Sequence, residues 1–224
     1  MKHYFLVLAL LAVVPFAYAQ NAKELYKQRN EMMKLSKGEL SEKASKAAAK
    51  EAKAYTKDGW KVAPGALPLR QQLDKSYAIQ QQYDENFESK FLMGEAISPG
   101  GTYDVARMQA LELAKLNLAG NIETVLVAET ESALGNQQLT KDQAASIVQT
   151  MQKSKSRISQ RIGKIITAVE LHRDTPSGKE VLIRIAYNTD KSKQAALDAM
   201  REELNKLGEG LDKKLEEVMG LKSE

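Results

Sequence analysis

The fold is decided by residues 165–188, which read IITAVELHRDTPSGKEVLIRIAYN. Two segments rich in β-branched residues flank the turn sequence Thr-Pro-Ser-Gly at residues 175–178. Such segments on either side of turn-forming residues predict an antiparallel β-hairpin. Because strand side chains alternate between the two faces of a sheet, we expect Val181, Ile183 and Ile185 to face covering helices together.

The most regular helical pattern precedes this hairpin. From Thr102 onward, small or aliphatic residues recur at three- and four-residue spacing, which predicts an amphipathic helix with one inward face. These positions are Ala106, Ala110, Leu113, Ala114, Asn117, Leu118, Asn121, Ile122 and Val125. Thr102 has the side chain of an N-cap, and Asp104 lies near the positive end of the helix dipole. Thr140 is expected to cap a further helix that ends near residue 162.

A third strand and another helical region complete the predicted core domain, residues 69–190. Residues 69–84 favour a helix. Residues 90–97 favour a short strand, which the sequence Ser-Pro-Gly-Gly at residues 98–101 is expected to end. Together these elements predict an α+β fold in which a small antiparallel sheet of about three strands packs against helices.

The segment before this domain divides into a helical part and a loop. Residues 20–57 contain no proline and many alanine, lysine and glutamate residues, which predicts a long N-terminal helical extension. Glycine and proline then predict a loop at residues 58–68. The loop holds Trp60, the one tryptophan of the chain, among apolar neighbours. Two roles stay open for Trp60: it holds the loop over the core, or it is exposed for recognition of a partner.

A C-terminal helix is expected over residues 191–224. Leucine, methionine and valine recur there at steps of three and four from Leu197 to Val218, which resembles a heptad seam. The first interpretation is that this seam packs on the sheet of its own chain. The alternative is a coiled-coil contact with a second chain or with the N-terminal helix. Gly208 and Gly210 weaken the helix locally.

Residues 1–19 have the composition of a cleavable secretory signal peptide. A short polar start precedes eleven apolar residues at 4–14, and Ala17 and Ala19 supply the small residues that a signal peptidase requires. Cleavage is expected between Ala19 and Gln20. Eleven apolar residues are too few for a membrane-spanning helix, which needs roughly 20, and no later segment approaches one. The mature protein is therefore expected to be periplasmic or secreted.

The chain has no cysteine among its 224 residues and a formal net charge of +4. The lack of cysteine excludes disulfides, thiol catalysis, cysteine metal ligands and the lipid attachment of a bacterial lipoprotein. The net charge is small, and no basic run is interleaved with aromatic residues. No nucleic-acid partner is therefore expected.

Few side chains of the sequence suit catalysis. Once the signal peptide is removed, His172 is the single histidine, so neither a Ser-His-Asp triad nor a zinc site is expected. We expect His172 to be a surface or hydrogen-bonded residue of a strand. The serine-nucleophile signatures Ser-x-x-Lys and Gly-x-Ser-x-Gly do not occur. Glu95 is the one acid of interest, because it lies in a short apolar strand, where an outward-facing position also explains it. The sequence thus predicts no catalytic residue, metal site or cofactor.

The turn before the long helix is a candidate anion site. Ser98, Gly100, Gly101 and Thr102 lead into a helix N-terminus, where free backbone N–H groups can bind an anion. The turn lacks the lysine of a phosphate loop and the full Gly-x-Gly-x-x-Gly spacing. An ordinary strand-to-helix turn with an N-cap is the simpler interpretation. With Trp60, these four residues are the binding candidates of the sequence.

Short motifs in the middle of the chain carry a resemblance to known proteins. They are Gly94 and Ala96, then Ala106-Arg107, Ala110, Ala114 and Leu118-Ala119, and finally Val181-x-Ile183-x-Ile185. Across about residues 91–190 this pattern is similar to the bacterial envelope lipoprotein family that includes the flagellar outer-membrane protein FlgP, although the chain lacks that family's lipid-bearing cysteine. The whole chain, including residues 59–69, also resembles uncharacterised exported proteins of Gram-negative anaerobes. That likeness implies an exported compartment and a fold, but no catalytic residues.

These observations favour a non-enzymatic exported envelope protein that acts through protein–protein or envelope association, including self-association. The alternative is a small-ligand-binding protein or a hydrolase that uses carboxylates of the acidic middle segment, residues 66–131. The lysine-rich ends of the chain also allow a weak electrostatic contact with the cell wall.

Overall fold

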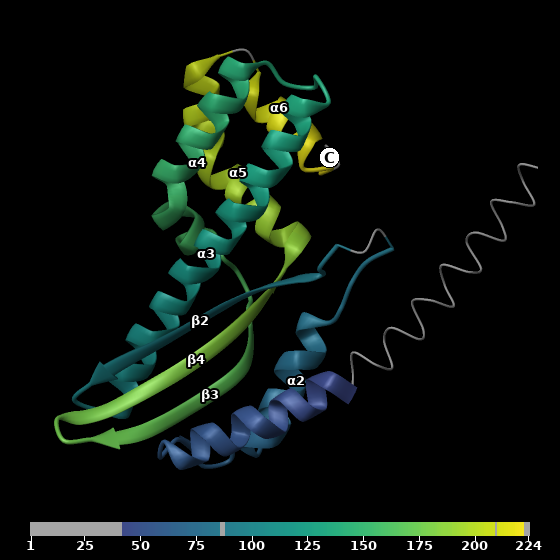
Figure 1. Ribbon diagram of the computed structural model, residues 1–224. Helices are drawn as coiled ribbons and strands as arrows, with labels where there is room; N and C mark the ends of the chain where they lie inside the picture. Colours follow the sequence, from purple (N-terminus) through teal and green to yellow (C-terminus); the bar gives the residue numbers. More distant parts are fainter. Residues whose placement is uncertain (1–41, 86–87, 209, 222–224) are drawn as a thin grey trace, which may run out of the picture. The chain divides into compact units, whose positions relative to one another are not determined.

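The computed structural model describes residues 42–85, 88–208 and 210–221. These residues form an α+β fold, as predicted, with helices on both faces of one antiparallel sheet (Figure 1). The described part of the sheet has four strands, one more than expected. Their order across the sheet is β1 (Lys61–Val62), β3 (Ile166–Thr175), β4 (Gly178–Asn188) and β2 (Phe91–Gly100). The additional strand, β1 (Lys61–Val62), lies inside the predicted loop and pairs with the edge of β3. Two residues are too few for their sequence to reveal a strand.

The predicted hairpin is confirmed. It consists of β3 (Ile166–Thr175) and β4 (Gly178–Asn188), which pair along their length. One irregularity in the pairing register lies between Thr167 and Val169. The alternation on β4 is also as predicted, because Val181, Ile183 and Ile185 are buried in the core cluster that the long helix α3 shares.

Strand β2 (Phe91–Gly100) is longer than the sequence indicated. The strand was expected to end before residue 98, but Ser98, Pro99 and Gly100 continue the antiparallel pairing with β4. β2 is an edge strand, so one row of its backbone groups has no neighbouring strand. A proline lacks the N–H that an inner strand would need, and at an edge this loss has no consequence for pairing.

Helix α3 (Tyr103–Gly135) lies over β2 and β4 on one face of the sheet. Thr102 is its N-cap and accepts a hydrogen bond from the Val105 N–H at 3.4 Å, as predicted. Two asparagines of α3 reach the outer edge of β2: Asn121 Nδ2 donates to the Met93 carbonyl at 2.7 Å, and Asn117 Nδ2 donates to the Glu95 carbonyl at 2.8 Å. These bonds occupy edge carbonyls that would otherwise be open to another strand.

The opposite face of the sheet is covered by the helical segment at residues 42–57 and by α2 (Leu69–Gln80). Trp60 is 6% exposed and packs in a cluster with Leu171 and Leu182 of the sheet. The interpretation of Trp60 as a core residue is therefore confirmed, and the alternative of an exposed recognition side chain is wrong. Burial of a large indole ring contributes more free energy than a solvent-facing position in the same loop.

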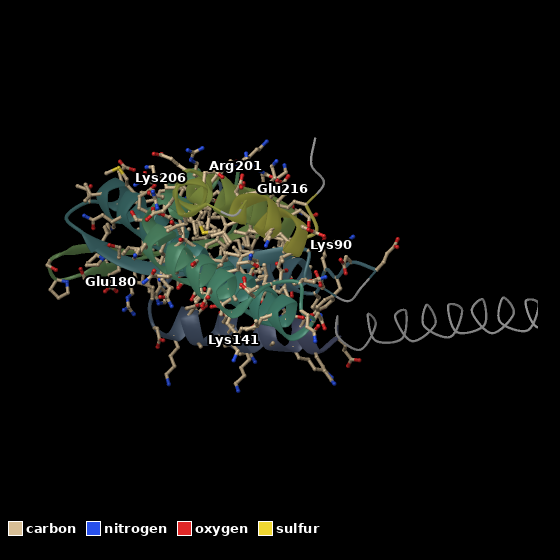
Figure 2. All side chains as sticks on the ribbon, turned by 90° about the horizontal axis from the view of Figure 1, so that it is seen from above. Lys90, Lys141, Glu180, Arg201, Lys206 and Glu216 are labelled. Atoms are coloured by element: carbon tan, nitrogen blue, oxygen red, sulfur yellow. The ribbon has the colours of Figure 1, made fainter. Side chains whose placement is uncertain are left out.

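The second half of α3 continues beyond the sheet into a helical bundle with α4 (Lys141–Arg161), α5 (Thr189–Leu207) and α6 (Leu211–Val218) (Figure 1). Apolar residues of all four helices share the main core. Figure 2 shows the charged side chains of Arg201, Lys206 and Glu216 on the outside of this bundle.

The C-terminal region differs from the expected single helix over 191–224. It divides at Gly208 and Gly210, whose φ angles of +82° and +63° lie in the left-handed region that glycine adopts without strain. Its apolar seam packs mainly on α4 and between α5 and α6, not on the sheet as first expected. The sheet face is already covered by α3, so the seam finds its apolar partners on other helices.

Thr140 begins α4 with a complete capping box. Its hydroxyl accepts from the Gln143 N–H at 3.3 Å, and the Gln143 side chain accepts from the Thr140 N–H at 3.1 Å. Thr140→Ala is expected to lower the free energy of unfolding by about 1 kcal/mol, measured by urea denaturation. Thr124→Ala in the middle of α3 is the control, and it should not destabilise the protein, because alanine favours a helix interior. Equal losses in both variants would contradict the role of the cap.

Candidate functional site

Four of the predicted binding residues, Ser98, Gly100, Gly101 and Thr102, lie together where β2 connects to α3, and Trp60 lies apart from them. Ser98 is 4% exposed, and its hydroxyl lies 3.1 Å from Gln109 Oε1 as a donor. Gly100 is a packing position, because an added Cβ would lie 2.6 Å from the Ala106 nitrogen. Together with the Thr102 cap, these contacts build the connection from β2 to α3. Trp60 packs against the opposite face of the sheet.

A charged cluster that the sequence did not predict lies on the face of the sheet toward α2. Its centre is Arg184 of β4, whose side chain is 12% exposed. Arg184 Nη2 contacts Glu51 Oε1 at 2.7 Å, and Arg184 Nε donates to the carboxylate of Glu95, the residue directly opposite it on β2. Arg184 Nη1 also contacts the Ser76 hydroxyl of α2 at 3.2 Å. One guanidinium therefore joins two strands and two helices.

The surroundings of Glu51 set its charge state. Burial raises the pKa of this carboxyl, but the hydrogen bond and charge of Arg184, with the nearby Tyr77 and Tyr55 hydroxyls, outweigh burial and hold the pKa below its ordinary value. Burial and the two carboxylates in turn raise the pKa of Tyr55. Glu51 Oε2 is buried and has no hydrogen-bond partner of normal geometry. The carboxylate is thus ionised, with part of its bonding capacity unused.

A shallow hollow of about 340 Å³ opens beside this cluster. The residues that line it are Tyr77, Gln80, Met93, Glu95, Asn121 and Arg184. Two carboxylates against one guanidinium leave the cluster with a formal charge of −1, and Glu95 is 38% exposed. The hollow therefore combines the Arg184 guanidinium with a partly exposed carboxylate, amide groups and one aromatic ring. Because the cluster has a net formal charge of −1, a small cationic group suits the hollow better than an anion.

A second cluster joins the start of α3 to β3. Glu170 accepts from Arg107 Nε at 2.8 Å and from the Tyr103 hydroxyl. Burial and the Glu170 carboxylate raise the pKa of Tyr103 to about 12. The ring of His172 packs edge-on against Tyr103 with 5.5 Å between ring centroids, and its Nδ1 is buried without a hydrogen-bond partner. His172 was expected to lie at the surface or to be hydrogen-bonded. Its Nδ1 is neither exposed nor hydrogen-bonded, so the expectation is wrong for this atom.

Acid should weaken both clusters. In Glu170, as in Glu51, burial raises the pKa, but the Arg107 and Tyr103 partners outweigh burial and hold the pKa below its ordinary value. A carboxyl with a lowered folded pKa stabilises the protein fully above its unfolded pKa, about 4.3, and this stabilisation is lost as the pH falls through the folded pKa.

We therefore expect a melting temperature that falls below about pH 4.3, with a smaller fall in Glu170→Gln. Thermal unfolding followed by circular dichroism at a series of pH values measures this. Glu129 has the opposite effect on stability as the pH falls. Its burial raises its pKa and outweighs the lowering effect of Lys193. A wild-type melting temperature that does not change between pH 6 and 3 (about the range in which carboxyl groups titrate) would contradict the proposed pairing.

Helix α3 presents apolar side chains on the side away from the sheet. Val105 is 40% exposed, Met108 62% and Leu113 43%. The described residues include seven exposed large hydrophobic side chains, and these three share one helix face while the other four lie on separate elements. A group of exposed large apolar side chains on one helix marks an interaction site more often than single exposed residues do.

The roles of Arg184 and of this outer face of α3 were not predicted from the sequence, for physical reasons. Arg184 is the one charged residue between Val181 and Asn188, and this was the available signal, but its pairing with Glu95 depends on the strand register. The periodicity of α3 selected mostly inward positions, but it also placed Leu113 on the inward face, and this expectation is wrong, because Leu113 is 43% exposed. The residues between the inward positions are also apolar, and this second stripe was the signal for an outward contact.

Among the described residues, no group of three or more histidine, aspartate or glutamate side chains is arranged to hold a metal ion. Within the same ranges, no helix has the length and apolar character needed to cross a membrane. No protein-family model, curated protein or solved structure matches the chain. The resemblance to envelope lipoproteins stays a prediction.

Proposed function

We propose that the protein is a non-enzymatic component of the bacterial envelope, exported from the cytoplasm, that acts by associating with other protein surfaces. The observation that carries this proposal is the apolar outer face of α3, where Met108 is 62% exposed. Leaving several large apolar side chains in water on one helix is unfavourable for a monomer, and covering them on association recovers that free energy.

The arrangement of charged side chains supports the same proposal. In three partly buried clusters among the described residues, acids and bases pair with one another: Arg184 with two glutamates, Glu170 with Arg107, and Lys193 with Glu129 at 2.5 Å. These pairs join strands to helices and helices to helices. They therefore have a structural explanation that requires no substrate.

The export step rests on residues 1–19, which lie outside the described residues together with the first part of the predicted N-terminal extension. If they act as a signal peptide, the protein recovered from the periplasm begins at Gln20. Intact-mass spectrometry measures this directly. A chain that keeps Met1 and stays with the cytoplasmic fraction would contradict export.

Association can be tested in the cells that produce the protein. After cross-linking with a membrane-permeable lysine reagent, purification of the wild-type chain should recover a reproducible cross-linked product. The variant Met108→Glu/Leu113→Glu should lose that product, because two carboxylates would replace apolar contacts. The control is Leu207→Glu, which changes a 52% exposed leucine on another helix and should keep the product. A product equally abundant in all three proteins would contradict a role for α3.

The hollow beside Glu95 favours a second candidate function, the binding of a small cationic ligand. A panel of small amines would raise the melting temperature of the wild-type protein if one of them fits. Glu95→Gln should abolish that rise, because the amide removes the exposed negative charge while keeping the shape. A rise that Glu95→Gln retains would place amine binding elsewhere.

A further inference from the structure

From the geometry of α3 we infer that the partner of its outer face is a second copy of this chain. The two copies would pair through an antiparallel contact between residues 105–116 of each α3. This inference rests on the proposed function and names the partner within it. Five observations carry it: the apolar stripe, its uncovered length, its symmetry, its flanking charges and the direction of the face.

The stripe follows from the helical positions of its residues. An α-helix turns about 100° per residue. Val105, Met108, Leu113 and Leu116 therefore fall within one side of α3, together with the polar residues Gln109 and Glu112. Ala110 and Ala114, which are fully buried, lie on the other side against the sheet, and the fully buried Ala106 lies beside Leu113 at the border between the two sides. The first half of α3 is thus apolar on both sides, as in a helix packed between two layers.

The length of the stripe is set by α4. The second half of α3 is covered on its corresponding side by α4, and an added Cβ at Gly120 would lie 3.0 Å from Lys155 Nζ of that helix. Figure 1 shows α4 beside the upper half of α3, with no helix in the same position along the lower half. This side of α3 is thus a helix-packing surface. The chain's own α4 covers its second half, and the stripe is the first half that α4 leaves uncovered.

The order of residues in the stripe is self-complementary. In an antiparallel pair centred between residues 110 and 111, Val105 faces the partner's Leu116, and Met108 lies at the same axial level as the partner's Leu113, toward the edge of the contact. By the same symmetry, Gln109 lies at the level of the partner's Glu112. Gln109 Oε1 accepts from Ser98 of its own chain, and its Nε2 can donate to the partner's carboxylate. Each contact occurs twice, as a two-fold axis requires. A parallel pair would instead place Glu112 against the partner's Glu112, which is unfavourable.

The charges beside the stripe favour the same orientation. Asp104 and Lys115 lie on one rim of α3, and Lys115 Nζ is 3.0 Å from Glu112 Oε1 in its own chain. In the antiparallel pair, Asp104 is displaced from the partner's Lys115 by only two residues, about 3 Å along the axis. Each lysine would then lie between two carboxylates, one from each copy. Such rim pairs add little affinity but favour one orientation over the other.

The outer face of α3 points away from the sheet that α3 covers. The two sheets would therefore lie on the far sides of the helix pair. Val105 and the partner's Val105 would be separated by eleven residues, about 16 Å along the axis. This spacing gives a specific test, because the chain contains no cysteine.

Single cysteines at residues 105 and 116 can test the register. A short bis-maleimide reagent is expected to cross-link a mixture of Val105→Cys and Leu116→Cys proteins into a covalent dimer. Either variant alone should give little dimer, because its two cysteines would be too far apart. Equal cross-linking of each variant alone would overturn the antiparallel register.

Sedimentation equilibrium of the full purified chain measures the dimer itself. We expect a dimer mass for the wild type and for Leu207→Glu, and at least about tenfold weaker dimerisation for Met108→Glu/Leu113→Glu. Circular dichroism of each variant checks that the fold is retained. All three positions are exposed in the structure, so the substitutions do not depend on repacking of the core.

The outcomes separate this inference from the proposed function. A wild-type chain that stays monomeric at about 100 μM and gives no cysteine cross-link overturns the dimer. If its lysine cross-linked product in cells still depends on residues 108 and 113, the association function stands with a different partner. If that product is also absent, both conclusions fail.

Discussion

Gly94→Val is expected to lower the free energy of unfolding by at least about 3 kcal/mol. An added Cβ at Gly94 would lie 2.3 Å from the Ala114 carbonyl oxygen and 2.7 Å from Leu118 Cβ. Both contacts belong to α3, where it crosses β2, so relief requires a shift of the helix from the sheet. Urea denaturation measures the loss, and the remaining folded fraction should also show altered packing by near-UV circular dichroism.

Gly101→Ala is the matched control for this substitution. Gly101 has no atom within 4 Å of an added Cβ and no positive φ angle, so its unfolding free energy should change by less than about 0.5 kcal/mol. Gly94 and Gly101 lie on the same short stretch of chain, and a difference between them therefore measures the close contact with α3. Similar losses in both variants would contradict that explanation.

Arg184→Met is expected to destabilise the protein by about 3 kcal/mol. The substitution keeps an unbranched apolar side chain but leaves Glu51 and Glu95 beside each other without a cation. Because Glu95 is 38% exposed, the loss should lie at the lower end of the range for buried pairs. Thermal and urea unfolding at neutral pH provide the measurement.

Two further variants make this prediction specific. Arg184→Met/Glu51→Met removes the buried acid together with its cation and should recover most of the lost stability. Lys206→Met removes the cation of the exposed pair with Glu202 and should leave the unfolding free energy unchanged. A double variant no more stable than Arg184→Met would show that the arginine acts through packing rather than through charge.

The elements with strong local patterns could be predicted from the sequence. The hairpin, the start of α3 at Thr102 and the cap of α4 at Thr140 each depend on residues within a few positions of one another. Turn and cap preferences are local properties, so the sequence carries them directly.

The features that depend on distant partners could not be predicted. β2 continues through Pro99 because β4 pairs with it there, and β1 exists because β3 offers an edge. The C-terminal seam packs on α4, since α3 already covers the sheet. In each of these cases the deciding partner lies far away in the sequence.

The candidate site was predicted less well than the fold. Glu95 was identified as unusual, but the residues of its cluster lie far apart in the sequence. Arg184 is 89 residues from Glu95, and Glu51 is 133 residues from Arg184. The binding candidates Ser98 and Gly100 have structural roles in the turn. The outer stripe of α3 was overlooked because its inward positions already explained the helix.

The most direct test of the account is photo-cross-linking from residue 108 in cells that produce the protein. A photoreactive amino acid at position 108 is expected to give a covalent product of twice the chain mass, because the outer face of α3 would be covered by a second copy. The same group at position 207 should give none. If position 108 gives no product above the level seen at position 207, the face is not an interface and the account is contradicted.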